Sequence, residues 1–144
     1  MKEDTWQRLE RMLGEHRESL VAGPQPRALV EEAIRRLGRP LWPDYVEFLV
    51  RYGGAMVGAD PIFGLGVCDV MSVDDTVDVQ TRRFRQAGWP GAERALVVST
   101  DSRGNPVFLC DDGRIRTFDH DSGETVELCD GFESFVSTLA LGRQ

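Results

Sequence analysis

Histidine is the side chain that most often exchanges protons in enzymes at neutral pH, and this chain has two, His16 and His120. His120 lies between two carboxylates in the segment Asp119-His120-Asp121. One carboxylate could orient the imidazole for acid-base work, or the three side chains could offer nitrogen and oxygen ligands to a metal ion. A hydrolase centred on His120 is therefore one hypothesis.

The same segment also has the composition of a hairpin turn that ends at Gly123. Aspartates in turns accept hydrogen bonds from nearby backbone amides, and glycine adopts the positive φ that turns require. A metal-dependent hydrolase needs further ligands at fixed spacing, and the sequence has no second histidine-rich segment. We favour the turn, and we expect no catalytic residue, no metal and no cofactor.

The other reactive side chains match no catalytic motif. Cys68, Cys110 and Cys129 are odd in number and form no C-x-x-C pattern, so we expect no disulfide scaffold or zinc site and a reducing cytosol. Cys110 and Cys129 end predicted strands and should be small buried thiols. No G-x-S-x-G elbow is present, and the glycines at 64 and 66 match neither a dinucleotide fingerprint nor a phosphate loop.

Charge limits the choice of partner. The chain has 17 basic and 24 acidic side chains and a net charge of -7, which repels nucleic acid and attracts basic proteins. Solubility alone also explains such a charge. There is no signal peptide and no apolar run of about 18 residues, so the sequence predicts a cytoplasmic protein without a membrane span.

Helical periodicity dominates the first half. We predict helices over residues 4–20, 26–37 and 43–52, with Asp4 capping the first and Gly38 and Gly53 ending the others. A polar helix capped by Ser72 and Asp75 should end near Gln86, across an edge of the sheet. A closing helix should begin at Asp130 with Glu133 as its capping partner, and its apolar face should carry Phe132, Phe135, Val136 and Leu139.

Strand signals dominate the second half. Short extended segments are expected at 55–57 and 62–65, then four strands within residues 95–129 separated by DSRGN, DDGR and HDSGE. The Asp112-Gly113 pair predicts a type I′ turn. The composition, 41% hydrophobic and 28% charged, is that of a folded protein, and 144 residues suit one domain spanning 1–144. The order of elements predicts an α+β fold with an antiparallel meander packed with N-terminal helices and a C-terminal helix.

Two sets of residues are candidates for contact with a partner. Trp42 and Tyr45 suit either core packing or an aromatic anchor in a binding cleft. Acidic side chains in turns and caps suit either local capping or a negative face. The full candidate set is Trp42, Tyr45, Asp60, Asp69, Asp74, Asp75, Asp78, Asp119, His120 and Asp121.

The segments LWPDYVEFLVRYGGA, IFGL, VVSTDSRGNPVFLCDDGRIRTFDHDSGE and FESFV together resemble the SUKH superfamily in order and spacing. Trp42 departs from its pattern by separating a leucine and a proline that are usually adjacent, and Asn105 replaces a common aspartate. The matching positions are Leu41, Pro43, Tyr45, Phe48, Leu49, Tyr52, Gly53, Gly54, Gly64, Gly104, Asp111, Gly113, His120 and Phe132.

The superfamily includes immunity proteins of bacterial polymorphic toxin systems and a fungal regulator of cell-wall synthesis. The resemblance implies a non-catalytic antitoxin that occupies or distorts the active site of a cognate toxin. If the toxin acts on nucleic acid, acidic side chains would take the place of phosphates, and association would depend on salt. An intracellular scaffold or regulator with several weak partners is the alternative.

Overall fold

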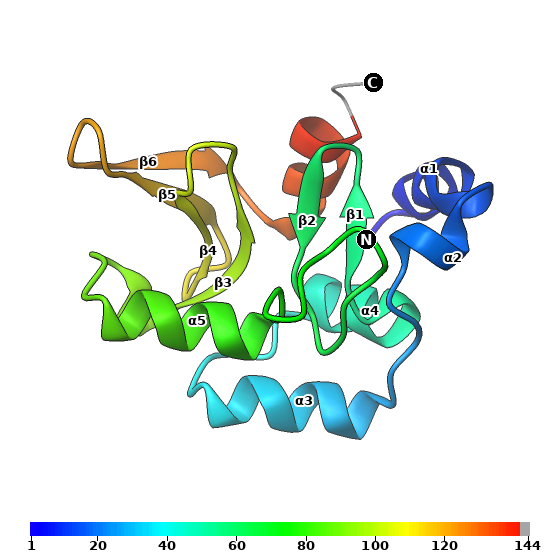
Figure 1. Cartoon of the computed structure of the whole chain (residues 1–144), viewed down its shortest axis with the longest axis horizontal. Helices are drawn as coiled ribbons and strands as arrows, with labels where there is room; N and C mark the ends of the chain where they lie inside the picture. Colours follow the sequence, from blue (N-terminus) through cyan, green and yellow to red (C-terminus); the bar gives the residue numbers. More distant parts are fainter. Residues whose placement is uncertain (142–144) are drawn as a thin grey trace.

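The computed structural model describes residues 1–141 and has an α+β fold (Figure 1). The helices α1 (Glu3–Gly14), α2 (Arg17–Leu20), α3 (Arg27–Arg36) and α4 (Pro43–Tyr52) gather on one side of the molecule. A four-stranded sheet curves on the other side, and the hairpin of β1 (Ala55–Val57) and β2 (Asp60–Ile62) lies between them.

The first predicted helix is two helices, because the chain turns between Gly14 and Arg17. The cap at its start is also different from the prediction. Lys2, and not Asp4, is the N-cap residue, and the carboxylate that accepts its backbone N–H belongs to Glu133. Glu133 also accepts the Thr5 hydroxyl at 3.0 Å. The start of α1 is therefore capped by a residue from the far end of the chain.

Glu133 consequently does not cap the closing helix as predicted. That segment starts with α6 (Phe132–Ser134), whose N-cap is Gly131, and continues as the π-helical η2 (Phe135–Ala140). Asp130 accepts the Ser134 hydroxyl at 2.6 Å instead of a backbone amide. Phe132, Phe135 and Val136 are buried as predicted, and the side chain of Leu139 lies outside the described residues.

The helix α4 confirms its prediction in full. Pro43 occupies its first turn, and Gly53, at a φ of 70°, ends it by donating its N–H to the Leu49 carbonyl at 2.8 Å. A Cβ atom on Gly53 would lie 2.0 Å from the Gly23 carbonyl oxygen, so no other residue fits there. The loop before α3 therefore packs directly on the end of α4.

Two boundaries after α4 differ from the predictions. The strand β2 begins at Asp60 and ends at Ile62, earlier than expected, with Pro61 paired to Met56 in a two-stranded sheet. The helix α5 (Val77–Gln86) begins later than expected, because Thr76 is its cap and accepts the Val79 N–H at 3.3 Å. Ser72 and Asp75 instead close a turn that precedes it.

The meander forms in the predicted order, with strands β3 (Ala95–Thr100), β4 (Pro106–Cys110), β5 (Ile115–Asp119) and β6 (Glu124–Cys129). A short turn of 3-10 helix, η1 (Ala92–Arg94), leads into it. The Asp112-Gly113 turn is not type I′. Only glycines have positive φ among residues 1–141, so Asp112 does not, and a three-residue loop closes through Gly113 at a φ of 86°.

One apolar core joins the two sides of the molecule. Tyr45 and Phe48 of α4 both meet Phe132 edge to face, with ring centroids 5.2 and 5.5 Å apart. Nearly all of β3 and β4 is buried, whereas β6 is exposed along most of its length. Within residues 1–141, no helix is both long enough and apolar enough to cross a membrane.

Candidate functional site

The segment Asp119-His120-Asp121 forms a hairpin turn, as the favoured interpretation predicts. Gly123, at a φ of 73°, donates its N–H to the Asp119 carbonyl at 2.8 Å. The Asp119 carboxylate accepts the Asp121 N–H at 2.9 Å, and this bond lowers the pKa of Asp119. The carboxylate thus holds the backbone of its own turn.

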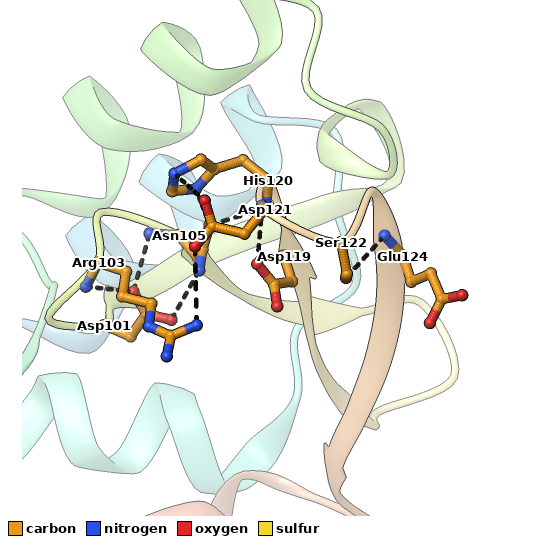
Figure 2. Close-up of polar contacts among 8 residues, drawn as sticks. All are labelled: Asp101, Arg103, Asn105, Asp119, His120, Asp121, Ser122 and Glu124. Carbon is orange, nitrogen blue, oxygen red and sulfur yellow. Dashed lines mark hydrogen bonds and ion pairs between the residues drawn. The ribbon is translucent and has the colours of Figure 1, made fainter.

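Asn105 connects this turn to the neighbouring β3–β4 turn (Figure 2). Its side-chain amide donates to Asp101 Oδ2 at 3.1 Å, which orients the amide oxygen toward His120. That oxygen accepts the His120 backbone N–H at 3.1 Å and also contacts Nδ1 of the ring at 2.5 Å. Asn105 is only 2% exposed, so the two hairpin tips are tied by a buried side chain.

The same contacts define what His120 can do chemically. Because an amide oxygen only accepts, Nδ1 carries a proton, and Nε2 is the free acceptor in the neutral ring. Asp121 Oδ1 lies 3.4 Å from Nε2, a contact that becomes an ion pair only when the ring is protonated. The hydroxyl of the adjacent Ser122 accepts the Glu124 N–H at 3.3 Å. Among the described residues 1–141, this hydroxyl makes no hydrogen bond to the His120 ring.

Metal ligands do not converge at this turn. No group of three His, Cys, Asp or Glu side chains in the described part of the chain is arranged to hold an ion. The three cysteines are free, and burial raises the pKa of both Cys110 and Cys129. Cys110 and Cys129 are only partly buried, which corrects the expectation of buried thiols, and a raised pKa disfavours the nucleophilic thiolate.

Trp89 is a residue of this cluster that the sequence did not single out. Its ring lies 5.9 Å from that of His120 and 5.9 Å from that of Phe118, and it meets Phe84 at 5.1 Å. Each pair is edge to face. The imidazole of His120 thus rests between an aromatic ring and the Asn105 amide, both contributed by segments far from it in the sequence.

The acidic candidates around α5 occupy a second region, and most of them already have partners. Asp74 pairs with Arg83 at 2.6 Å and Asp78 with Arg82 at 2.7 Å. Asp75 accepts the Ser72 N–H at 3.0 Å. Asp69 is exposed and has no hydrogen bond or ion pair within residues 1–141. The loop also exposes Val70 and Val73, the latter at 81%, which the sequence analysis did not identify as surface residues.

Two of the candidates are buried, which corrects the expectation that they contribute to an exposed surface. Tyr45 is 0% exposed, and its hydroxyl donates to the Phe63 carbonyl at 2.6 Å. Burial raises its pKa far above the ordinary range for tyrosine. The core-packing interpretation therefore holds for Tyr45. Asp60 is 7% exposed at the start of β2 and adds little to a negative face.

Trp42 is only partly buried and lines a cavity of about 270 Å³ beside the β4–β5 turn. Its indole covers Gly113 so closely that a Cβ there would lie 3.0 Å from the ring. Asp112 and Phe132 line the same cavity. The indole N–H is buried and has no acceptor within residues 1–141. Trp42 thus combines packing with a partly accessible surface.

The arrangement defines an α+β domain in which a helical layer and a curved meander share one core. The model of the SMI1 / KNR4 family (SUKH-1) matches residues 26–138, which is most of the chain, and the chain belongs to this family. The match confirms the resemblance to the SUKH superfamily. No curated protein matches the chain.

Proposed function

We propose that this chain is a non-catalytic protein-binding domain, specifically a cytoplasmic immunity protein that neutralises a cognate bacterial toxin. Membership of the SUKH-1 family over residues 26–138 is the observation that carries the proposal, because the superfamily includes immunity proteins. Inhibition requires only that the domain occupies or distorts the active site of the toxin, with no covalent step.

The use of the polar groups supports a binding role over a catalytic one. Nδ1 of His120 is engaged by Asn105, and the Asp119 carboxylate holds the turn. Burial raises the pKa of the Cys110 and Cys129 thiols, which disfavours the nucleophilic thiolate. A general base needs a proton donor within hydrogen-bond reach, and the group beside Nε2, the free ring nitrogen of His120, is the Asp121 carboxylate at 3.4 Å.

Charge supports a basic partner. A net charge of -7 attracts a protein whose active site binds phosphates, and acidic side chains can take the place of those phosphates. A nuclease toxin fits this description. Long-range attraction of this kind accelerates association and is screened over about 8 Å at physiological salt. The association rate should therefore fall steeply as salt increases.

Co-purification tests the proposal most directly. The tagged chain is expressed in its native host, and partners that remain bound in stoichiometric amounts are identified and expressed separately. We expect one toxin domain, bound with about nanomolar affinity, whose toxicity is abolished by co-expression of this chain. Failure to retain any stoichiometric partner at low salt would contradict the proposal. Several weak partners would instead identify a scaffold or regulator.

The variant His120→Ala separates binding from catalysis. Protection by His120→Ala equal to that of the original chain would remove the main motivation for the hydrolase hypothesis, provided that both chains accumulate equally. His16→Ala is the matched control, since His16 lies at the exposed turn between α1 and α2. Loss of protection in His120→Ala alone, with toxin affinity unchanged, would support the hydrolase hypothesis.

A further inference from the structure

The outer edge of β6 is an open strand edge. β6 is the last strand in the order β3-β4-β5-β6, and no other strand or bridge within residues 1–141 pairs with its outer side (Figure 1). In an antiparallel pair, alternate residues direct N–H and C=O groups away from the neighbouring strand. From Glu124 to Glu127 every residue of β6 is exposed.

On each face of the sheet, a cavity lined by the inner strands and loops extends to one residue of β6. Consecutive residues of a strand point to opposite faces, so Thr125 and Val126 are on different sides. Thr125 lines a cavity of about 360 Å³ whose walls include Phe108, Pro90 and Arg116. Val126 lines a cavity of about 260 Å³ with Thr117 and Asp119. An added strand would direct alternate side chains toward the two cavities.

We propose that the outer edge of β6 is the docking site for an extended segment of the partner protein, which adds a fifth strand to the sheet. This inference rests on the proposed function only in assuming that a protein partner exists. Backbone hydrogen bonds from an added strand supply affinity, and pockets for its alternate side chains supply specificity. β6 offers both features in one place.

The charges beside β6 indicate that the docked partner segment carries basic side chains on one of its faces. Glu124 and Val126 share a face, and the Glu124 carboxylate has no hydrogen bond or ion pair within residues 1–141. The cavity on this face also contains Asp101 and Asp119. Its basic side chain, Arg103, is paired with Asp121 at 3.7 Å. A lysine or arginine of the partner therefore fits this side.

The opposite face suits an apolar side chain. Phe108 and Pro90 are among the residues that line the cavity beside Thr125, and most of its lining surface is apolar. Arg116, which also lines it, is already bonded to Asp112 at 2.7 Å. The docked segment should therefore alternate basic and apolar residues.

A second copy of the chain is a poorer occupant. It would bring another net charge of -7 and another Glu124 against the same edge, and charges on an edge strand oppose self-pairing. We therefore assign the edge to a basic partner segment and treat self-association as an outcome that would overturn this assignment.

A synthetic probe tests the edge without requiring the natural partner. The probe is a capped peptide of about ten residues that alternates lysine and valine, long enough to span one strand. Two further peptides carry N-methyl groups on every lysine or on every valine, which removes the N–H groups from one edge of the peptide but retains every side chain. Binding is followed by the amide NMR signals of the isotope-labelled full chain.

We expect the amide shifts to be confined to residues 124–129 and their neighbours in β5. One methylated peptide should lose about tenfold or more in affinity, because several backbone hydrogen bonds are lost, and the other should bind nearly as well as the parent. Equal binding of all three peptides would show side-chain attraction alone and would overturn the proposal. Shifts centred on another surface would do the same.

Charge reversal supplies the matched variants. Glu124→Lys should weaken binding of the probe about fivefold, whereas Glu18→Lys, an equal change on the distant α2, should leave it within about twofold. Equal effects of the two variants would overturn the proposal. A dimer in sedimentation experiments, with the β6 amides protected, would assign the edge to a second copy instead.

These readouts separate the two proposals. Probe binding at β6 without any captured toxin would remove the immunity function and leave the docking edge. Capture of a toxin whose affinity is unchanged by Glu124→Lys, and which leaves the β6 amides unprotected, would retain the immunity function and overturn the docking edge.

Discussion

The outer edge of β3 finds its hydrogen-bond partners within the chain. The Val97 N–H donates to Thr81 Oγ1 at 2.9 Å, and the Val98 carbonyl accepts the Phe63 N–H at 2.8 Å. Arg85 donates to the Ala95 carbonyl at 3.0 Å. The outer edge of β6 pairs with no strand or bridge within residues 1–141, and residues 124–127 are exposed.

Burial explains this difference. A backbone N–H or C=O that is buried without a partner costs about 1 to 3 kcal/mol, so the deeply buried β3 requires protein partners. β6 is at the surface, where water satisfies its outer groups. The hydrogen bonds at the outer edge of β3 therefore maintain the fold, whereas the backbone groups at the outer edge of β6 remain available to another molecule.

Matched valine truncations should show the largest contrast. Val98 is fully buried in β3, and Val98→Ala should lower the free energy of unfolding by about 2 kcal/mol through lost burial and a residual cavity. Val126 is 42% exposed, and Val126→Ala should cost less than about 0.5 kcal/mol. Urea unfolding of the two variants measures both values. Similar losses would show that β6 is as tightly packed as β3.

A pair of threonine variants isolates the hydrogen bonds from the packing. Thr81→Val keeps the shape of the side chain but removes the hydroxyl that accepts the buried Val97 N–H, so it should cost about 1 to 2 kcal/mol. Thr125→Val on the open edge should change the free energy of unfolding by less than about 0.5 kcal/mol. A neutral Thr81→Val would mean that the β3 edge is satisfied in another way.

The Asn105 hydrogen bonds join the β3–β4 and β5–β6 hairpin tips. Their removal should lower the free energy of unfolding less than Val98→Ala or Thr81→Val. Asn105→Ala removes the acceptor of both His120 contacts and should cost about 1 kcal/mol. Amide hydrogen exchange should show faster opening of β5 and β6 and little change in β3. His120→Ala should act in the same direction, less strongly, and His16→Ala should have no effect. Uniform acceleration across the sheet would contradict this local role.

The elements that the sequence predicted well are those whose signals are local. The helix at 43–52 has Pro43, an apolar spacing and Gly53 within a dozen residues, and each turn of the meander has its own glycine. The cap of α1 could not be predicted, because Glu133 lies 131 residues from the Lys2 amide that it accepts. Long-range contacts of this kind leave no pattern in a single sequence.

The same distinction between local signals and long-range contacts applies to the candidate site. The Asp119 turn was predicted because its glycine and aspartates are adjacent, whereas the roles of Asn105 and Trp89 depend on contacts between separate hairpins and loops. The residue type of Tyr45 suits both core packing and partner binding, but its position in the helical periodicity indicates core packing. The periodicity that predicts α4 places Tyr45 on the face shared with Phe48 and Leu49, and this face is buried.

Lowering the pH should produce the smallest difference in stability between the two sheet edges. The pKa of Asp119 is lowered in the folded chain, chiefly by the Asp121 N–H that its carboxylate accepts. A lowered folded-state pKa stabilises the chain above the ordinary value of about 3.9, and this contribution is lost as the pH falls through the folded value. The β3 bonds to Thr81 and Phe63 have no titrating group, so they should persist until the whole chain unfolds.

The variant Asp119→Asn makes this test specific, because its amide oxygen still accepts a hydrogen bond but carries no charge. The stability difference between the two chains should therefore be present at pH 6 and shrink below about pH 4, while the Asp121 and Gly123 amide signals of the original chain shift over the same range. A difference that stays constant with pH would show that the Asp119 charge does not hold the turn. The β5–β6 tip would then depend on Gly123 and the Asn105 bonds alone, and the open edge would be no more sensitive to acid than the covered one.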